Sequence, residues 1–131
     1  MVKMKIPIIY EDEYIIAADK PAGLLSYPLP GSDEETIGDI LGAKPVHRLD
    51  RDTSGILLLA KSDEAKDAMQ DLFKNRDIQK TYIALVWGAL EPKRGEIIIP
   101  LGRGAKDRLK TVPHASGRAS HTIYELSLIH I

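Results

Sequence analysis

Residues 47–60 read HRLDRDTSGILLLA, a polar and turn-forming segment set directly before an apolar run. The apolar part, Ile56–Ala60, is typical of a buried strand, and the Thr53-Ser54-Gly55 before it is typical of a turn. A rigid strand that carries a polar loop at its end is a common way to present a catalytic group. The pattern therefore predicts a functional loop that is anchored to the core of the fold.

The flanking sequence predicts an α+β fold: a largely antiparallel mixed sheet flanked by a few helices. Alternating and apolar runs, separated by Pro- and Gly-containing turns, indicate the strands. They predict a hairpin over residues 8–18 and further strands over 56–60, 78–87, 95–101 and from 121 onward. A short helix is expected over residues 36–41.

A longer helix is expected after Ser62, which has the side chain of an N-cap. Asp63 and Glu64 would then stand at the positive end of the helix dipole. Apolar residues recur at helical spacing and predict one buried stripe, with the helix ending near Asn75. The members of this stripe are Ala65, Met69, Leu72 and Phe73.

Composition sets limits on the kind of protein. The chain has 131 residues, a net charge of −1 and no cysteine, which excludes disulfides and thiolate metal sites and is compatible with a reducing compartment. It contains no apolar run long enough to span a membrane, so a cytoplasmic protein with no membrane partner is expected. The near-neutral charge argues weakly against a nucleic-acid partner, but its distribution is uneven. Between Gly102 and Arg118, five basic residues, Arg103 and Arg108 among them, stand against the single acid Asp107, so this segment is either a phosphate-contacting surface or a solvated loop.

Asp50 is the first candidate for chemistry. In an extended segment Arg48 and Asp50 point to the same side, and the guanidinium would lower the pKa of the carboxyl and keep it ionised. An ionised Asp can act as a nucleophile or general base. The alternative is that Asp50 or Asp52 caps the turn through backbone amides. His47 is expected to be packed or hydrogen-bonded, because the histidines show no spacing typical of a metal site.

Tyr82 is the second candidate. If residues 78–87 form a strand, Lys80, Tyr82, Ala84 and Val86 share one face of it. A tyrosine among small and apolar neighbours is often a core residue. Its ring could instead stack on a flipped-out base while its hydroxyl handles a proton.

Four segments together resemble the RluA-type RNA pseudouridine synthases, in the order in which that family carries them. The first two are Lys20–Leu25, like the family's lysine-proline-glycine turn, and His47–Gly55, with Asp50 at the family's invariable aspartate. Lys80–Tyr82, with Ala84 and Gly88, resembles the tyrosine-bearing strand, and the stretch from Gly117 to Tyr124 resembles the next one. The resemblance runs from about Ile8 to Tyr124, and the His-Arg-Leu-Asp form favours this branch over the RsuA-type branch.

The resemblance implies isomerisation of uridine to pseudouridine in structured rRNA or tRNA, by a protein acting as a monomer without cofactor, metal or protein partner. Asp50 would be the essential carboxylate, Tyr82 would stack on the uracil, and Arg48 would hold Asp50 ionised. We expect His47, Lys80, Arg103 and Arg108 to contribute to substrate binding. Two alternatives stay open: an RNA-binding fragment of the same fold that has lost turnover, and a small hydrolase that uses Asp50 and Asp52.

The last residues depart from the family pattern. Residues 1–125 correspond to the N-terminal part of a single catalytic domain, and the family's later basic motif does not follow them. Residues 126–131, LSLIHI, are the translation of a common sequencing-library adapter, so we expect this tail to be non-native. The alternative is a natural strand end.

Overall fold

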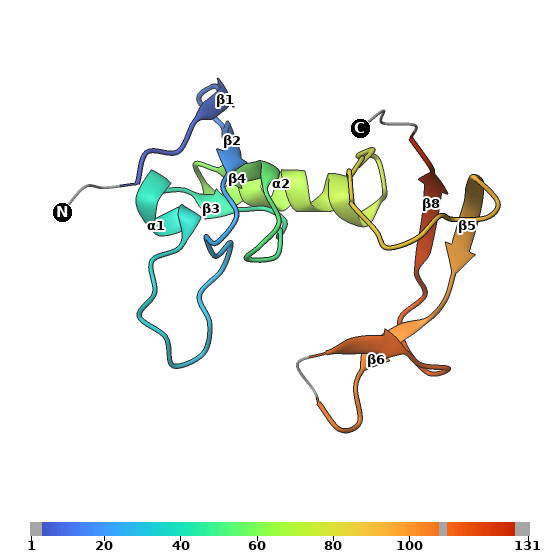
Figure 1. Ribbon diagram of the computed structural model, residues 1–131. Helices are drawn as coiled ribbons and strands as arrows, with labels where there is room; N and C mark the ends of the chain where they lie inside the picture. The colour runs from blue at the N-terminus through green and yellow to red at the C-terminus, as the bar shows by residue number, and fades with distance from the viewer. Residues whose placement is uncertain (1–3, 108–109, 128–131) are drawn as a thin grey trace. The chain divides into compact units, whose positions relative to one another are not determined.

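The computed structural model describes residues 4–107 and 110–127 of the chain. The chain divides into two compact units, residues 1–81 and 82–131, and each is described by itself. Sheets are antiparallel throughout the named strands, and helices are few (Figure 1). The predicted α+β class is therefore confirmed.

A four-stranded sheet forms the centre of the first unit, with strand order β1-β2-β4-β3. Its strands are β1 (Ile8–Glu11), β2 (Ile15–Lys20), β3 (Lys44–Pro45) and β4 (Gly55–Ala60). The predicted hairpin corresponds to β1 and β2, and the predicted strand over 56–60 to β4. Asp12 fixes the hairpin turn because its Oδ1 accepts hydrogen bonds from the amides of Tyr14 and Ile15, each at 2.8 Å.

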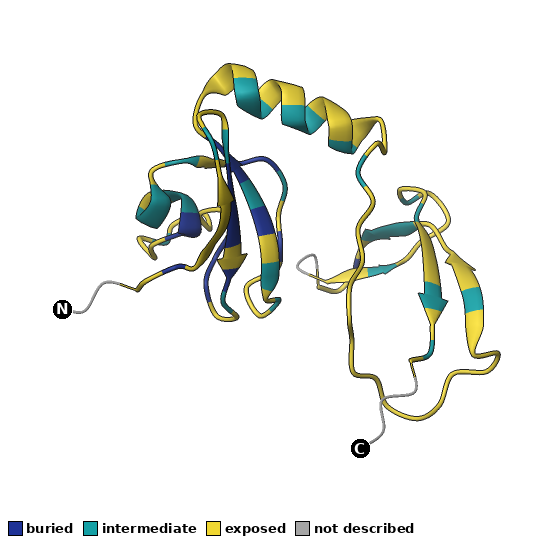
Figure 2. Cartoon of the chain, turned by 90° about the horizontal axis from the view of Figure 1, so that it is seen from above, coloured by how far each residue is buried: buried dark blue, intermediate teal, exposed yellow. Residues whose placement is uncertain are grey.

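The core lies on one face of this sheet, where alternate residues of β2 and β4 point inward. Figure 2 shows buried residues on these strands in dark blue. The cluster also takes in α1 (Ile37–Leu41), whose Ile37 is fully buried. Thr36 caps α1 in a reciprocal box with Asp39, as the predicted short helix requires. The cluster consists of Ile6, Ile16, Ala18, Leu24, Ile37, Leu49, Leu57 and Leu59.

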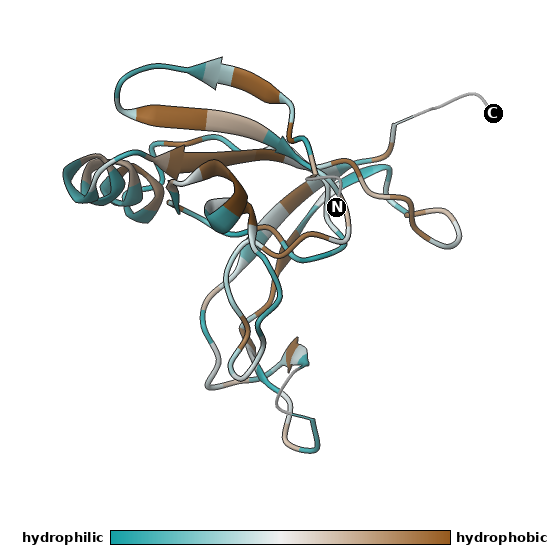
Figure 3. Ribbon diagram, turned by 90° about the vertical axis from the view of Figure 1, so that its left-hand side faces the viewer, coloured by the Kyte–Doolittle hydropathy of each residue, from teal (hydrophilic) through white to brown (hydrophobic). Residues whose placement is uncertain are grey.

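The longer helix α2 (Asp63–Lys74) begins after the Ser62 cap and ends at Asn75, as predicted. It packs against β4. The expectation of a buried stripe is wrong, however, because α2 has no buried residue and Leu72 is exposed. Hydrophobic and hydrophilic residues alternate along α2 in Figure 3, whereas the strands of the first unit carry more continuous hydrophobic colour. One edge of the stripe is nevertheless half-covered, at Ala65, Met69 and Phe73.

The strand predicted over residues 78–87 is also wrong. This segment has no strand structure, and the side chains of Ile83 and Leu85 are 93% and 96% exposed. An apolar alternating run forms a strand only where a neighbouring strand takes up its backbone hydrogen bonds, and no described strand pairs with this one. The sequence pattern thus identifies a segment suited to a strand, but a partner is missing from the described residues.

Two small antiparallel pairs make up the second unit. β5 (Arg94–Ile98) pairs with β8 (His121–Glu125), close to the strands predicted over 95–101 and from 121. β6 (Leu101–Arg103) pairs with β7 (Thr111–Pro113). The basic segment therefore contains a hairpin that the sequence pattern does not predict. The expected non-native tail lies partly outside the described residues, which end at Ser127.

Candidate active site

The polar segment His47–Asp52 connects β3 to β4 and is anchored on both sides. Before it, the Val46 amide donates a 3.0 Å hydrogen bond to the Leu58 carbonyl of β4. After it, the Thr53 amide donates to the Asp50 carbonyl at 3.1 Å and closes a turn. The predicted loop on a buried strand is therefore present, and Asp50 stands at its bend.

The carboxylate of Asp50 is open to solvent, with its side chain 84% exposed. Its contact among the described residues is with Arg48, whose Nη2 lies 3.9 Å from Oδ1. The two side chains share one side of the segment, as predicted, but both are so exposed that solvent screens most of their attraction. No backbone amide of the described chain donates to this carboxylate, which is not what a turn-capping Asp would show.

His47 is a packed and hydrogen-bonded residue. Its Nε2 accepts a 3.0 Å hydrogen bond from the Leu58 amide, which fixes the neutral ring with its proton on Nδ1. The ring also stacks on Phe73 of α2, with centroids 4.6 Å apart. Burial lowers the pKa of His47 below its ordinary value, and the nearby positive charge of Lys80 lowers the pKa further. His47 therefore supports the loop as a neutral ring.

The candidate residues divide between the two units. Arg48, Asp50 and Lys80 belong to the first unit, and Lys80 lies within electrostatic range of His47. Tyr82 is the first residue of the second unit and is 58% exposed. The alternation that would place Tyr82 on one face with Lys80 does not apply, because residues 78–87 form no strand.

Two of the basic residues predicted to contact substrate, Arg103 and Arg108, belong to the second unit. Arg103 ends β6 and is exposed at the hairpin with β7. Arg108 lies outside the described residues. The described part of this segment thus places Arg103 at the end of β6, in the small antiparallel hairpin with β7.

Two residues with no assigned role in the sequence prediction hold the backbone beside Asp50. The buried Ser26 hydroxyl donates to the Leu49 carbonyl at 2.6 Å and accepts from the Leu49 amide at 3.1 Å. The Lys20 ammonium donates to the Arg51 carbonyl at 3.0 Å. A signal for Lys20 was present in the sequence, because strand alternation places it on the same inward face as Ile16 and Ala18.

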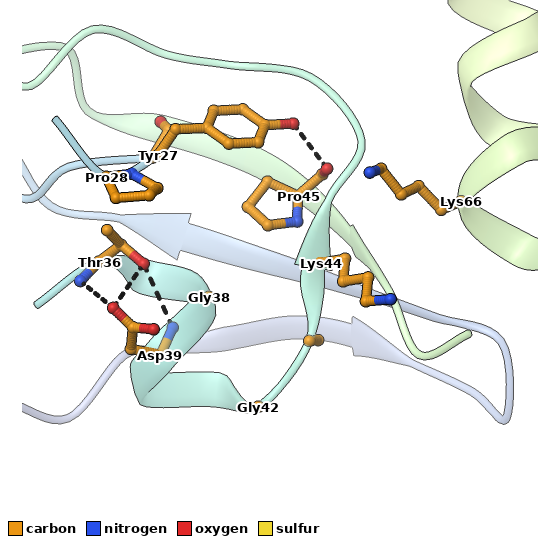
Figure 4. A pocket seen from close by; sticks show the side chains of 11 residues that line it. Tyr27, Pro28, Thr36, Gly38, Asp39, Gly42, Lys44, Pro45 and Lys66 are labelled. Carbon is orange, nitrogen blue, oxygen red and sulfur yellow. Dashed lines mark hydrogen bonds between the residues drawn. The ribbon is translucent and has the colours of Figure 1, made fainter. Parts of the chain in front are cut away.

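A shallow depression of about 370 Å³ lies beside α1 and β3 (Figure 4). Its walls include Tyr27, Lys44 and Lys66, and none of its lining residues comes from the segment His47–Asp52. The Tyr27 hydroxyl donates to the Pro45 carbonyl at 2.7 Å. Burial raises the pKa of Tyr27, and the positive charge of Arg48 opposes this shift. The depression is thus a neighbour of Arg48, separate from Asp50.

The described residues form neither a metal site nor a membrane-spanning helix. Within residues 4–107 and 110–127, no group of three His, Asp or Glu side chains is arranged to hold a metal ion. No helix in the described ranges is both long and apolar enough to cross a bilayer.

The sequence of the chain also matches a known protein family. The model of the RNA pseudouridylate synthase family matches residues 14–128, which includes the Asp50 loop and nearly all of both units. This chain belongs to the RNA pseudouridylate synthase family. The resemblance drawn from the sequence motifs is therefore confirmed.

Relatives with curated names support the RluA-type branch of the pseudouridylate synthases. The chain is 41% identical over 130 residues to the "Dual-specificity RNA pseudouridine synthase RluA" of Vibrio cholerae, covering 92% of this chain and 52% of the relative. It is 36% identical over 130 residues to the "Ribosomal large subunit pseudouridine synthase D" of Xanthomonas campestris, covering 91% of this chain and 39% of the relative. The chain thus spans about half or less of the length of these relatives.

Solved pseudouridylate synthase structures share the fold. Human RNA Pseudouridylate Synthase Domain Containing 1 superposes with a TM-score of 0.71 at 22% identity, over 91% of this chain and 50% of that one. At this identity the likeness concerns the fold alone. It agrees with the α+β architecture described above.

Proposed function

We propose that the protein containing this chain isomerises uridine to pseudouridine in structured RNA, with Asp50 as the acting carboxylate. The reaction breaks the N-glycosidic bond of the uridine and rejoins the same sugar carbon to a ring carbon of the uracil. An ionised carboxylate can assist either by attacking as a nucleophile or by taking a proton. Asp50 is the residue of this chain whose position in the family motif and whose exposure both suit that role.

The observation that carries the proposal is an accessible carboxylate on a firmly held loop. Asp50 is 84% exposed, whereas Leu49 beside it is buried in the core. Because no described backbone amide donates to the Asp50 side chain, its oxygens are available to a substrate. A reactive group that is open to substrate and fixed through its backbone meets the main geometric demand of catalysis.

Positive side chains near Asp50 suit an RNA substrate. Arg48 makes only a long contact with Asp50, so its guanidinium can turn to a phosphate or occupy the space left by an extruded nucleotide. Lys80 lies within electrostatic range of His47 in the first unit. We assign Arg48 and Lys80 to substrate binding, with the neutral His47 supporting the loop beneath them.

The second unit would supply the remaining groups. We propose that Tyr82 stacks on the uracil and takes part in proton transfer, and that Arg103 and Arg108 contact phosphates. The exposure of Tyr82 and Arg103 is consistent with contact to RNA. Aromatic stacking is a general means of holding an unpaired base.

The substrate is proposed to be an rRNA or tRNA stem-loop in the cytoplasm, met by the protein as a monomer and without a cofactor. The names of the Vibrio cholerae and Xanthomonas campestris relatives, a dual-specificity enzyme and a ribosomal large subunit enzyme, favour these RNA classes. The target nucleotide must leave the base stack to reach Asp50, and this costs least in a loop or bulge.

The test is pseudouridine formation on uridine-containing rRNA and tRNA stem-loops by the wild type and by Asp50→Asn. We expect turnover that disappears in Asp50→Asn while RNA binding is retained. Asp52→Asn is the matched control, because Asp52 is a second exposed carboxylate two residues away. Equal turnover by wild type and Asp50→Asn would overturn the assignment.

The same experiment separates the alternatives. RNA binding without any turnover in the wild type would favour a binding fragment of this fold. Loss of activity in both Asp50→Asn and Asp52→Asn would instead favour chemistry that uses the carboxylate pair.

A further inference from the structure

Arg51 follows Asp50 directly, and its side chain is ion-paired with a distant part of the first unit. Its Nη2 donates to Glu34 Oε2 at 2.9 Å, which joins residues 17 positions apart in the chain. Arg48, the arginine on the other side of Asp50, makes only a 3.9 Å contact with that carboxylate. Of the two guanidinium groups that flank Asp50, one is thus loosely held and the other already bonds an anionic oxygen.

Glu34 belongs to an acidic loop, residues 28–35, which contains three acids and no basic residue. The Glu34 amide donates to Ser32 Oγ at 3.1 Å, and this bond fixes the backbone that carries the carboxylate. The other two acids of the loop make no ion pair in the described parts of the chain. Within those parts, an ion pair neutralises the negative charge of the loop only at Arg51, beside Asp50.

The ion pair between Arg51 and Glu34 is easily exchanged. Both side chains are 42% exposed, and an exposed pair contributes little to stability because solvent screens it and both side chains lose rotamer freedom. The backbone of Arg51 is held independently of the pair, since its carbonyl accepts from the Gly23 amide at 2.7 Å. The guanidinium can therefore leave Glu34 without displacing the loop that carries Asp50.

A phosphate is the group suited to replace the Glu34 carboxylate. A planar guanidinium binds carboxylate and phosphate oxygens through the same N–H donors. The nucleotide that reaches Asp50 is linked to its neighbours by a phosphate on each side, so backbone phosphates must come close to the residues around Asp50. In the RNA-free protein, Glu34 thus occupies donors of Arg51 that suit the backbone of the substrate.

We propose that Arg51 is a phosphate-binding residue of the RNA site and that Glu34 is its internal competitor, which RNA displaces. This inference rests on the proposed function, because it takes the surface around Asp50 as the RNA site. An RNA that places a phosphate at Arg51 replaces the lost ion pair. An RNA that does not do so meets the acidic loop, and the like charges repel each other. The pair therefore lowers affinity in general and favours RNAs whose backbone passes Arg51.

The test measures the Kd of the full chain for a fluorescein-labelled, uridine-containing tRNA stem-loop by fluorescence anisotropy. Glu34→Gln frees Arg51 and should tighten binding by about two- to fivefold. Arg51→Gln should weaken binding by about fivefold or more, and should reduce the slope of log K against log salt by about one. The gain from Glu34→Gln should be smaller in the Arg51→Gln background than in the wild type, because no pair is left to break.

Two controls match the Glu34→Gln substitution. Glu11→Gln breaks an ion pair with Lys61 of similar length, 2.7 Å, at the opposite end of the β2–β4 pair from the Asp50 segment. Glu35→Gln removes the same charge from the residue next to Glu34. Glu11→Gln should leave the Kd close to that of the wild type, and Glu35→Gln should give a smaller gain than Glu34→Gln. Circular dichroism and melting establish that each variant folds.

A second readout follows the exchange of partners directly. The NMR resonance of the Arg51 Nε–H group should differ between the RNA-free wild type and RNA-free Glu34→Gln, because the carboxylate partner is lost in the variant. With saturating RNA the two resonances should coincide, since the guanidinium then bonds a phosphate in both proteins. This readout does not depend on turnover.

A resonance difference that persists with saturating RNA would overturn the inference, because the ion pair would then have stayed closed. Unchanged RNA affinity and salt slope in Arg51→Gln, or equal gains from Glu34→Gln and Glu35→Gln, would overturn it as well. A wild type that binds RNA without turnover would contradict the proposed function instead, and the binding measurements would still decide the role of Arg51. A wild type that binds no RNA would overturn both.

Discussion

The Ser26 hydroxyl satisfies both backbone groups of Leu49, donating to its carbonyl at 2.6 Å and accepting from its amide at 3.1 Å. Ser26 is only 4% exposed and Leu49 6%, so water does not readily replace this side chain. The pair connects residues that are 23 positions apart in the chain. It joins the turn after β2 to the residue that precedes Asp50.

Replacing Ser26 with alanine should lower the stability of the first unit. Ser26→Ala leaves a buried amide and a buried carbonyl unpaired, and we expect the free energy of unfolding to fall by about 2 kcal/mol. Urea denaturation followed by circular dichroism measures this change. Ser32→Ala, in an exposed loop, should change the free energy by less than about 0.5 kcal/mol. Equal effects from the two variants would contradict the prediction.

Stability should decrease in mildly acidic solution because of His47. Burial makes the folded-state pKa of His47 lower than its unfolded value of about 6.5. Below that value the unfolded chain takes up the proton more readily than the folded chain does. The stabilising contribution is therefore complete above pH about 6.5 and is lost as the pH falls through the lower folded pKa.

Unfolding measured at a series of pH values from about 7 to 5 tests this prediction. His47→Gln keeps an acceptor for the Leu58 amide but cannot be protonated, so its stability should vary less over this interval. His114→Gln, at an exposed site in the second unit, should retain the pH dependence of the wild type. A His47→Gln profile parallel to that of the wild type would refute the role given to the ring.

Gly23 and Gly31 make a matched pair for testing the turn after β2. Both have a left-handed backbone, with φ of 92° and 75°, and an added Cβ would meet no atom within 4 Å at either site. Substitution by alanine should therefore destabilise each by a similar amount, roughly 1–2 kcal/mol. Alanine keeps the backbone amide but strains the backbone that directs it. Of the two glycines only Gly23 donates its amide to the Arg51 carbonyl, so Gly23→Ala should also reduce pseudouridine formation. Comparable turnover by the two variants would show that the turn does not act on Asp50.

Arg48 should contribute to RNA affinity through a phosphate contact. Arg48→Ala is expected to weaken binding of RNA and to reduce the slope of log K against log salt by about one. Filter binding or fluorescence anisotropy at several salt concentrations measures the slope. Lys61→Ala removes a positive charge that is already paired with Glu11 at 2.7 Å and should leave the slope close to that of the wild type. An unchanged slope in Arg48→Ala would exclude the phosphate contact.

Local patterns were enough to predict much of the first unit. The apolar run of β4, the hairpin of β1 and β2, and the Ser62 cap of α2 depend on neighbours close in sequence, and all three are present. The strand expected over residues 78–87 depends on a partner strand, which no local pattern supplies. The buried stripe of α2 failed for a similar reason, since periodicity shows which face is apolar and not whether another element covers it.

In the candidate site, too, contacts between sequence neighbours could be predicted and contacts between distant residues could not. Arg48 and Asp50 could be paired from the sequence because they lie two positions apart in an extended segment. The contacts of Lys20 with Arg51 and of Ser26 with Leu49 join residues 31 and 23 positions apart, so they depend on the pairing of β2 with β4 and on the path of the turn. The buried lysine was visible in the strand alternation, but its acceptors were not.

The Lys20 ammonium donates only to main-chain oxygens, those of Pro21, Leu24 and Arg51, so these contacts do not depend on the side chain at position 51. Arg51 can change to many other residues and still offer the same carbonyl, whereas position 20 tolerates few replacements. A saturation mutagenesis profile of this protein should therefore show an invariant lysine facing a permissive neighbour across the loop. Substitutions at position 51 could then change the surface beside Asp50 to suit different RNAs without changing the position of the Asp50 carboxylate.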